Sequence, residues 1–156
     1  MAFEGGQKRK KLVWSMAILA ATVVGAGLLT MAVTNYFRSQ NPIYQCMHDP
    51  AQQPFQLSVP INVTEDGRPV PVPKGIGIDN NCIHPIYTLD QNIIHVSYSR
   101  PYDFTLGHFL YYWLGDKLQN FNTKVFINGR QHTEGSILDI PLKGGESIHL
   151  ILTRKS

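Results

Sequence analysis

The chain has 156 residues, and its 14 lysines and arginines exceed its 11 acids to give a formal net charge of +3 at pH 7. The cluster Lys8-Arg9-Lys10-Lys11 accounts for the excess, because removing it together with Glu4 leaves ten bases and ten acids. The remaining chain therefore has no basic excess of the kind that nucleic-acid binding needs, and we predict no nucleic-acid partner.

An uncharged run of 22 residues, Leu12 to Val33, follows the basic cluster. As a helix it would extend about 33 Å, enough to cross a bilayer core about 30 Å thick. We predict a cytoplasmic basic tail (1–11), a transmembrane helix (12–33) and an extracytoplasmic remainder, in a single-pass protein of the cell membrane. The alternative is a cleaved signal sequence, although signal apolar runs are usually about 7 to 15 residues long. Thr30-Met31-Ala32 keeps cleavage open, and the remainder is exported either way.

Residues 34–54 are polar and rich in proline, which predicts a tether between the membrane and an exported domain over residues 55–156. Cys46 and Cys82 lie on the exported side, where disulfides persist. Only one pairing is open to them, and it would stabilise the fold by roughly 3 to 4 kcal/mol. Separate roles for the two thiols are the competing interpretation. Asn62 begins an Asn-Val-Thr triplet and is a glycosylation candidate.

Apolar and polar residues alternate from Phe55 to Thr64, which predicts a half-buried strand that Pro60 restricts to a sheet edge. Glu65-Asp66-Gly67 predicts a turn, and residues 70–73 continue as extended chain. Residues 93–98 are the next predicted strand.

One helix is predicted outside the membrane, from Thr105 to about Trp113, because Leu106, Phe109, Leu110 and Trp113 share one face. Either Thr105 or Asp103 can cap its start. Asn128-Gly129 predicts a hairpin after a strand at 124–127, and further strands are expected at 137–142 and 147–153. This order indicates an α+β domain with one helix packed on a mixed sheet. The aromatic residues of the helix that we take as partner-binding candidates are Tyr111, Tyr112 and Trp113.

The stretch from Phe104 onward resembles the second half of β-grasp (ubiquitin-like) domains. In those domains a Thr-Leu-Gly helix start, here Thr105-Leu106-Gly107, precedes a strand, an Asn-Gly hairpin and a last strand entered through a Gly-Gly-Glu turn. Members that act as sulfur or protein carriers end in a free Gly-Gly, whereas this chain ends Thr153-Arg154-Lys155-Ser156. The resemblance therefore implies a β-grasp-like fold with a binding or assembly role.

A longer stretch, about residues 57 to 152, resembles an uncharacterised family of exported archaeal and bacterial domains. The matching segments are Val72-Pro73-Lys74-Gly75-Ile76-Gly77-Ile78, Cys82, Thr88-x-Asp90, Ile93-Ile94-His95 and Phe104-Thr105-Leu106-Gly107. Many such domains occur in ammonia-oxidising archaea, whose oxidation and respiratory machinery depends on copper. The resemblance implies the fold and export, and it names no activity.

Family members carry a His-Thr-His-Asp run after the cysteine, and here Tyr87 and Leu89 replace its two histidines. Imidazole and thiolate ligands suit copper or zinc. The candidates for a metal site in this chain are Cys82, His84, Asp90 and His95. In the competing interpretation Cys82 is half of a disulfide, Asp90 forms a turn and His95 is a structural strand residue.

No catalytic motif accompanies these residues, and we do not expect an enzyme. The leading hypothesis is a single-span accessory or interaction protein that contacts the bilayer and a membrane-protein partner. It would serve as a small subunit of a larger complex, such as an archaeal ammonia-oxidation or respiratory assembly. The alternative hypothesis is an extracytoplasmic copper- or zinc-binding domain.

Overall fold

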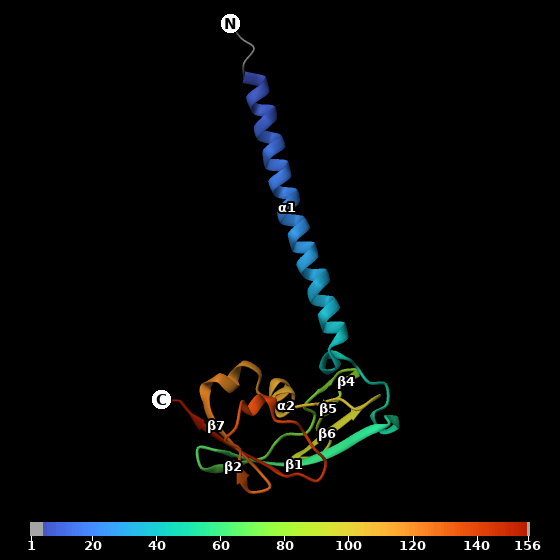
Figure 1. Ribbon diagram of the computed structural model, residues 1–156, viewed down its shortest axis with the longest axis vertical. Helices are drawn as coiled ribbons and strands as arrows, with labels where there is room; N and C mark the ends of the chain where they lie inside the picture. The colour runs from blue at the N-terminus through green and yellow to red at the C-terminus, as the bar shows by residue number, and fades with distance from the viewer. Residues whose placement is uncertain (1–4, 156) are drawn as a thin grey trace. The chain divides into compact units, whose positions relative to one another are not determined.

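A computed structural model of the chain describes residues 5–155. It divides into two compact units, Met1–Asn41 and Pro42–Ser156. The first unit contains one long helix, α1 (Gly5–Gln40), drawn in blue in Figure 1. The second is a mixed β-sheet domain with one α-helix, α2 (Leu106–Trp113), which confirms the α+β class.

Helix α1 covers the predicted apolar run and extends beyond it on both sides. Its stretch Met16–Phe37, 22 residues long, is apolar enough to cross a membrane, and none of its most apolar window is buried. The hydroxyls of Thr22, Thr30 and Thr34 each donate to a carbonyl four residues earlier at 2.8 Å, so these polar groups are satisfied within the helix. A membrane anchor and a signal sequence both have this composition.

The segment predicted as a tether has more structure than a tether requires. Helix α1 continues to Gln40, and two short 3₁₀ helices follow, η1 (Pro42–Tyr44) and η2 (Pro50–Gln52). Ile43 and Met47 are buried in the domain, and a disulfide joins Cys46 to it. The second unit accordingly begins at Pro42 rather than at residue 55.

The main sheet has seven strands in the order β5-β6-β1-β9-β7-β8, with β2 also paired to β1. Its strands are β1 (Phe55–Glu65), β2 (Arg68–Val70), β5 (Ile86–Tyr87), β6 (Ile93–Tyr98), β7 (Phe121–Ile127), β8 (Arg130–Gln131) and β9 (Ile148–Arg154). The central strands β1 and β9 run parallel, whereas β6 and β7 are antiparallel to them. A separate hairpin is formed by β3 (Ile78–Asp79) and β4 (Cys82–Ile83).

Strand β1 follows the predicted alternation, with Val59, Ile61 and Val63 buried. Pro60, however, does not place it at the sheet edge, because β1 pairs with β6 and β9. The Ile61 N–H donates to the carbonyl of Asn92, on the β6 side of the strand, at 2.8 Å. Because successive backbone nitrogens of a strand point to opposite neighbours, the Pro60 nitrogen points toward β9. The β9 ladder begins only at Ile61, and the missing donor of Pro60 therefore interrupts no strand pairing.

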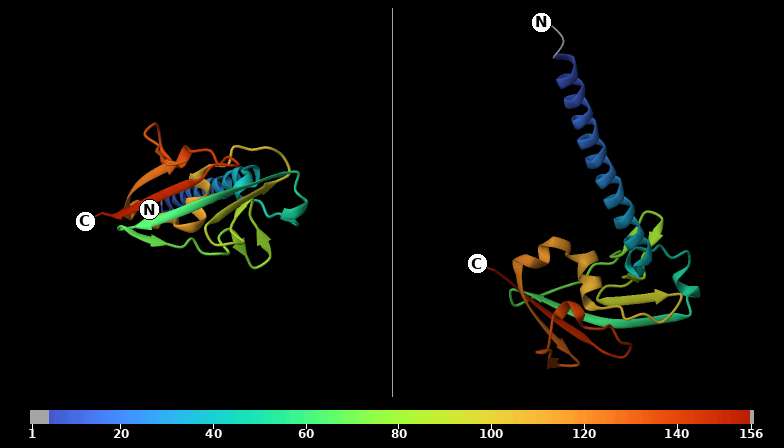
Figure 2. Two further views of the ribbon diagram at one scale, coloured as in Figure 1. Left: turned by 90° about the horizontal axis from the view of Figure 1, so that it is seen from below. Right: turned by 45° about the horizontal axis from the view of Figure 1, so that its top comes forward.

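Helix α2 lies on one face of the sheet (Figure 1; Figure 2) and buries Leu106, Phe109 and Leu110 in the core. Its predicted start is confirmed, because the Thr105 hydroxyl accepts a hydrogen bond from the His108 N–H at 3.4 Å. The His108 ring returns the interaction, since Nδ1 accepts from the Thr105 N–H at 3.1 Å. The two residues form a capping box that satisfies two N–H groups at the start of the helix.

The Asn128-Gly129 hairpin is confirmed, with positive φ at both residues, as its turn type requires. The strand expected at 137–142 is not formed. Instead η4 (Ile137–Asp139) begins where the Ser136 hydroxyl accepts from the Leu138 N–H at 3.2 Å. This local side-chain hydrogen bond competes with strand pairing. The strand-like pairing of residues 137–142 is limited to one isolated β-bridge between Thr105 and Pro141.

Candidate functional site

The β3–β4 hairpin is held against the main sheet by Gly77. This residue has φ of +71°, and a Cβ added to it would collide with the backbone carbonyl of Ile86. The Gly77 carbonyl accepts a hydrogen bond from the His84 N–H at 2.9 Å. Only glycine combines a positive φ with such a close approach to another backbone segment. This contact fixes the position of the hairpin that carries His84 and Asp79.

The disulfide between Cys46 and Cys82 is confirmed, and it closes a sequence separation of 36 residues. The hypothesis that the two thiols have separate roles is therefore wrong for this state of the protein. A second link lies beside the disulfide, because the Met47 N–H donates to the Ile83 carbonyl at 2.8 Å. Cys46 is exposed, whereas Cys82 is half-buried, so the two sulfurs lie in different environments.

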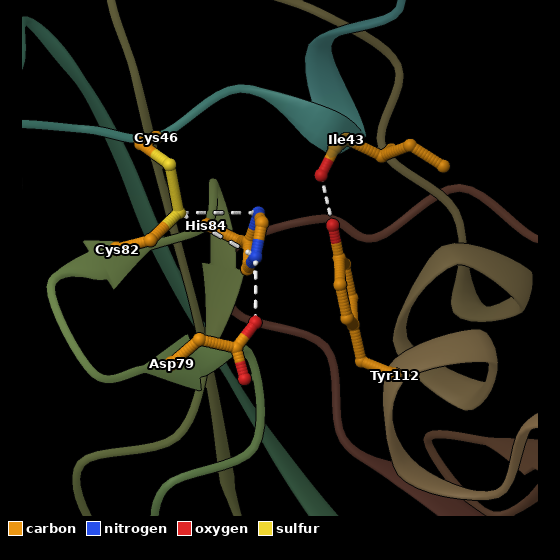
Figure 3. Close-up of a disulfide and its surroundings, with 6 residues drawn as sticks. All are labelled: Ile43, Cys46, Asp79, Cys82, His84 and Tyr112. Carbon is orange, nitrogen blue, oxygen red and sulfur yellow. Dashed lines mark hydrogen bonds and ion pairs between the residues drawn. A yellow bond between two sulfur atoms is a disulfide. The ribbon is translucent and has the colours of Figure 1, made fainter. Parts of the chain in front are cut away.

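His84 is buried next to the disulfide (Figure 3). Its two ring nitrogens lie 3.6 Å (Nε2) and 3.8 Å (Nδ1) from the Cys82 Sγ. The same Nε2 atom is 3.2 Å from Oδ2 of Asp79, whose side chain is 78 % exposed. From the solvent inward, the Asp79 carboxylate lies next to the His84 imidazole, and the imidazole lies next to the Cys82 sulfur.

Tyr112 of α2 closes the other side of the imidazole. Its ring stacks on His84 with 4.8 Å between centroids and 28° between planes. Its hydroxyl donates a hydrogen bond to the Ile43 carbonyl (Figure 3). Burial, assisted by Tyr111, Tyr44 and Asp79, raises the pKa of Tyr112 well above its ordinary value, so the phenol stays neutral and remains a donor.

The four predicted metal ligands are brought together only in pairs. Cys82 and His84 belong to the disulfide cluster, and the disulfide removes the thiolate of Cys82 from coordination. Asp90 and His95 form a second pair, with 3.9 Å between Oδ2 and Nε2. Within residues 5–155 no group of three or more histidine, cysteine, aspartate or glutamate side chains is arranged to hold a metal ion.

His95 takes part in the packing of the sheet face opposite α2. Its Nδ1 atom shares a hydrogen bond of 3.0 Å with the Ser58 hydroxyl, and its ring stacks on Tyr87 at 5.6 Å. Its buried Nε2 atom has no hydrogen-bond partner in the described part of the chain. The Ser58 and Tyr87 contacts are those of a structural strand residue, and the Nε2 atom is not accounted for by them.

The other predicted site residues are separated. Asn62 is exposed in β1, within a strand rather than a loop, and the Thr64 hydroxyl of its triplet shares a 2.9 Å hydrogen bond with His149. Trp113 is half-buried and packs on Phe109 at 5.9 Å.

Tyr111 is 52 % exposed, and its ring meets that of Tyr44, 38 % exposed, edge to face at 6.1 Å. Of the three aromatic residues predicted as partner-binding candidates, Tyr111 is therefore the most accessible.

Sequence reasoning missed Asp79 and Tyr44. The signal for Asp79 was present, because Asp79-Asn80-Asn81-Cys82 has the composition of a tight turn that places its first and last residues opposite each other. Asp79 and Cys82 are indeed paired across this hairpin. No comparable local pattern marks Tyr44, which meets Tyr111 only after the domain has folded.

The geometry of this cluster is the basis for assigning its chemistry. Comparison of the chain with family models, with curated proteins and with solved structures finds no match.

Proposed function

We propose that this chain is a single-span, membrane-anchored interaction protein that presents its domain on the extracytoplasmic side of the membrane to a membrane-protein partner. The observation that carries the proposal is the stretch Met16–Phe37, which is long and apolar enough to span a bilayer. None of its most apolar window is covered by the rest of the chain. Such a surface is favourable only in contact with lipid or with another apolar helix.

Two features support this orientation. Four basic residues precede the apolar stretch and only Arg38 follows it closely, the asymmetry that keeps the N-terminal side in the cytoplasm. The domain also carries a disulfide, which persists in oxidising compartments outside the cytoplasm.

The proposed fold is a β-grasp variant. In support, its first and last long strands, β1 and β9, run parallel at the centre of the sheet. The helix α2 connects β6 to β7, the strands that flank this central pair. This topology supports the β-grasp-like fold that the Thr-Leu-Gly helix start and the Asn-Gly hairpin suggest.

The partner-binding surface that we propose is the exposed pair Tyr44 and Tyr111. Tyrosine combines a large apolar ring with a polar group and is enriched at protein interfaces and at membrane surfaces. Tyr44 lies only seven positions after Phe37 in the sequence, a length that reaches at most about 25 Å when fully extended. A partner embedded in the same bilayer is therefore within reach of this pair.

Native electrophoresis of the full chain, extracted from its own membrane in mild detergent, tests the proposal. We expect the wild-type chain to migrate as a complex, and the Tyr44→Ser/Tyr111→Ser variant to migrate as a monomer. Leu89→Ser is the control, because Leu89, 53 % exposed, is as accessible as Tyr111 and lies outside the tyrosine pair. A wild-type monomer, or a complex that persists in the tyrosine variant, would contradict the assigned role.

A protease added outside intact cells tests the orientation separately. It should cleave the domain and leave the basic tail protected. Protection of the domain would reverse the proposed topology.

A further inference from the structure

We propose that the Cys46–Cys82 disulfide is a thiol–disulfide exchange site, in which Cys46 is attacked by a dithiol partner and Cys82 leaves as a thiolate stabilised by His84. The proposal does not depend on the membrane topology. It rests on the different surroundings of the two sulfurs and on the groups that face one of them.

Access distinguishes the two cysteines. Cys46 is exposed in the segment between η1 and η2, whereas Cys82 is half-buried at the end of the β3–β4 hairpin. Exchange requires a thiolate to approach one sulfur in line with the bond that breaks, so we assign the attack to the sulfur of the exposed residue, Cys46. The sulfur that leaves is then Cys82, which lies against His84 (Figure 3).

The surroundings of Cys82 favour its departure. A thiolate is stabilised by an adjacent protonated imidazole, and a more stable leaving thiolate accelerates exchange. His84 presents ring nitrogens at 3.6 and 3.8 Å from Sγ, and Asp79 lies 3.2 Å from Nε2. The Asp79 carboxylate holds the imidazole through its contact with Nε2, and the stacked Tyr112 ring limits its rotation.

The exchange balances as two displacements. The partner's thiolate forms a bond to the Cys46 sulfur, the Cys46–Cys82 bond breaks, and its electron pair goes to the Cys82 sulfur, which takes a proton from His84. The partner's second thiolate then attacks the partner sulfur of the mixed disulfide and releases Cys46 as a thiolate, which is protonated by water. The protein disulfide is reduced to two thiols, and the partner dithiol is oxidised to a disulfide.

The same segment favours the reverse reaction, in which the Cys46–Cys82 disulfide forms again. The bridge between Met47 and Ile83 holds the two chain segments together independently of the sulfurs. After reduction the thiols therefore stay close, and His84 can accept the proton of Cys82 when the disulfide closes again. The partner is identified by its chemistry as a protein dithiol.

The rate of reduction of the full chain in detergent, with dithiothreitol as the probe, tests the role of His84. Rates are corrected to a constant thiolate concentration and measured by alkylation and mass. We expect His84→Gln to slow reduction about tenfold, and Asp79→Asn to slow it less. The control is His48→Gln, which removes an exposed histidine two residues from Cys46 and should change the rate less than about twofold.

The pH profile separates a chemical role from a structural one. The corrected rate of the wild type should fall as the pH rises, and His84→Gln should lose this dependence while keeping a native circular dichroism spectrum. An unchanged rate in His84→Gln, or the same pH profile in both proteins, would overturn the proposal.

A second measurement needs no variant. The wild-type chain is treated with glutathione, quenched in acid and digested, and the mixed disulfide is located by mass spectrometry. We expect the adduct on Cys46, and an adduct mainly on Cys82 would overturn the assignment.

Discussion

Gly77→Ala tests whether a single close backbone approach holds the disulfide cluster in place. Gly77 has φ of +71°, and its new Cβ would lie on the Ile86 carbonyl oxygen and 3.1 Å from the carbonyl carbon. Because both obstructing atoms are backbone, they cannot rotate away as a side chain would. Either the β3–β4 hairpin or β5 must move.

The expected magnitude has two parts. Alanine at positive φ costs about 1 to 2 kcal/mol relative to glycine. Overpacking against a fixed neighbour adds about 1 to 3 kcal/mol. We therefore expect Gly77→Ala to lower the free energy of unfolding by about 2 to 5 kcal/mol. At about 4 °C per kcal/mol for a domain of this size, the melting temperature should fall by about 8 to 20 °C.

Gly75→Ala is the matched control. Gly75 has φ of +86°, but an added Cβ would meet no atom within 4 Å. It carries the conformational cost alone, and its melting temperature should fall by about 4 to 8 °C. Thermal unfolding of the full chain in detergent, measured by near-ultraviolet circular dichroism, follows the packing of the aromatic residues in the domain. Equal losses in the two variants would refute the argument from the Ile86 contact.

Two further predictions concern stability. Burial lowers the pKa of His108 below its ordinary 6.5, so the folded state binds a proton more weakly than the unfolded state. The contribution of His108 to the free energy of unfolding should be full above about pH 6.5 and should decline below it. We expect His108→Gln to weaken this decline, measured by urea titrations at successive pH values. Glutamine keeps the capping bond to Thr105 but does not titrate. An identical decline in the variant would place the titrating group elsewhere. Replacing Cys46 and Cys82 by serine should lower the free energy of unfolding by about 4 kcal/mol, given the 36-residue separation. Urea unfolding measures this loss, and an unchanged midpoint would show that the disulfide does not stabilise the folded state relative to the unfolded one.

Features set by neighbouring residues could be predicted from the sequence. The alternation from Phe55 predicted β1, Thr105 predicted the start of α2, and Asn128-Gly129 predicted the β7–β8 turn. Each depends on a periodicity or on a conformational preference that acts over a few residues. The strand expected at 137–142 is absent because Ser136, an equally local signal, caps a 3₁₀ helix instead.

Features set by distant contacts could not be predicted. Pro60 indicated an edge strand, because the sequence does not reveal that β9 pairing begins one residue later. For the candidate site, the sequence allowed the pairing of Cys46 with Cys82 and noted His84. The approach of Asp79 and Tyr112 to that histidine depends on the hairpin, on Gly77 and on helix packing together. No single stretch of residues contains that information.

The parallel pairing of β1 with β9 also sets an order of events during biosynthesis. Ile61 pairs with Ile148, so the centre of the sheet cannot form until nearly all of the domain has been synthesised. Cys46 and Cys82 are separated by only 36 residues and are available much earlier. Because closing the shorter loop costs less entropy, we expect the covalent link to form on a chain that is still open. Oxidation would then precede the native sheet, and the enzyme that oxidises this chain would meet an extended substrate rather than a folded one.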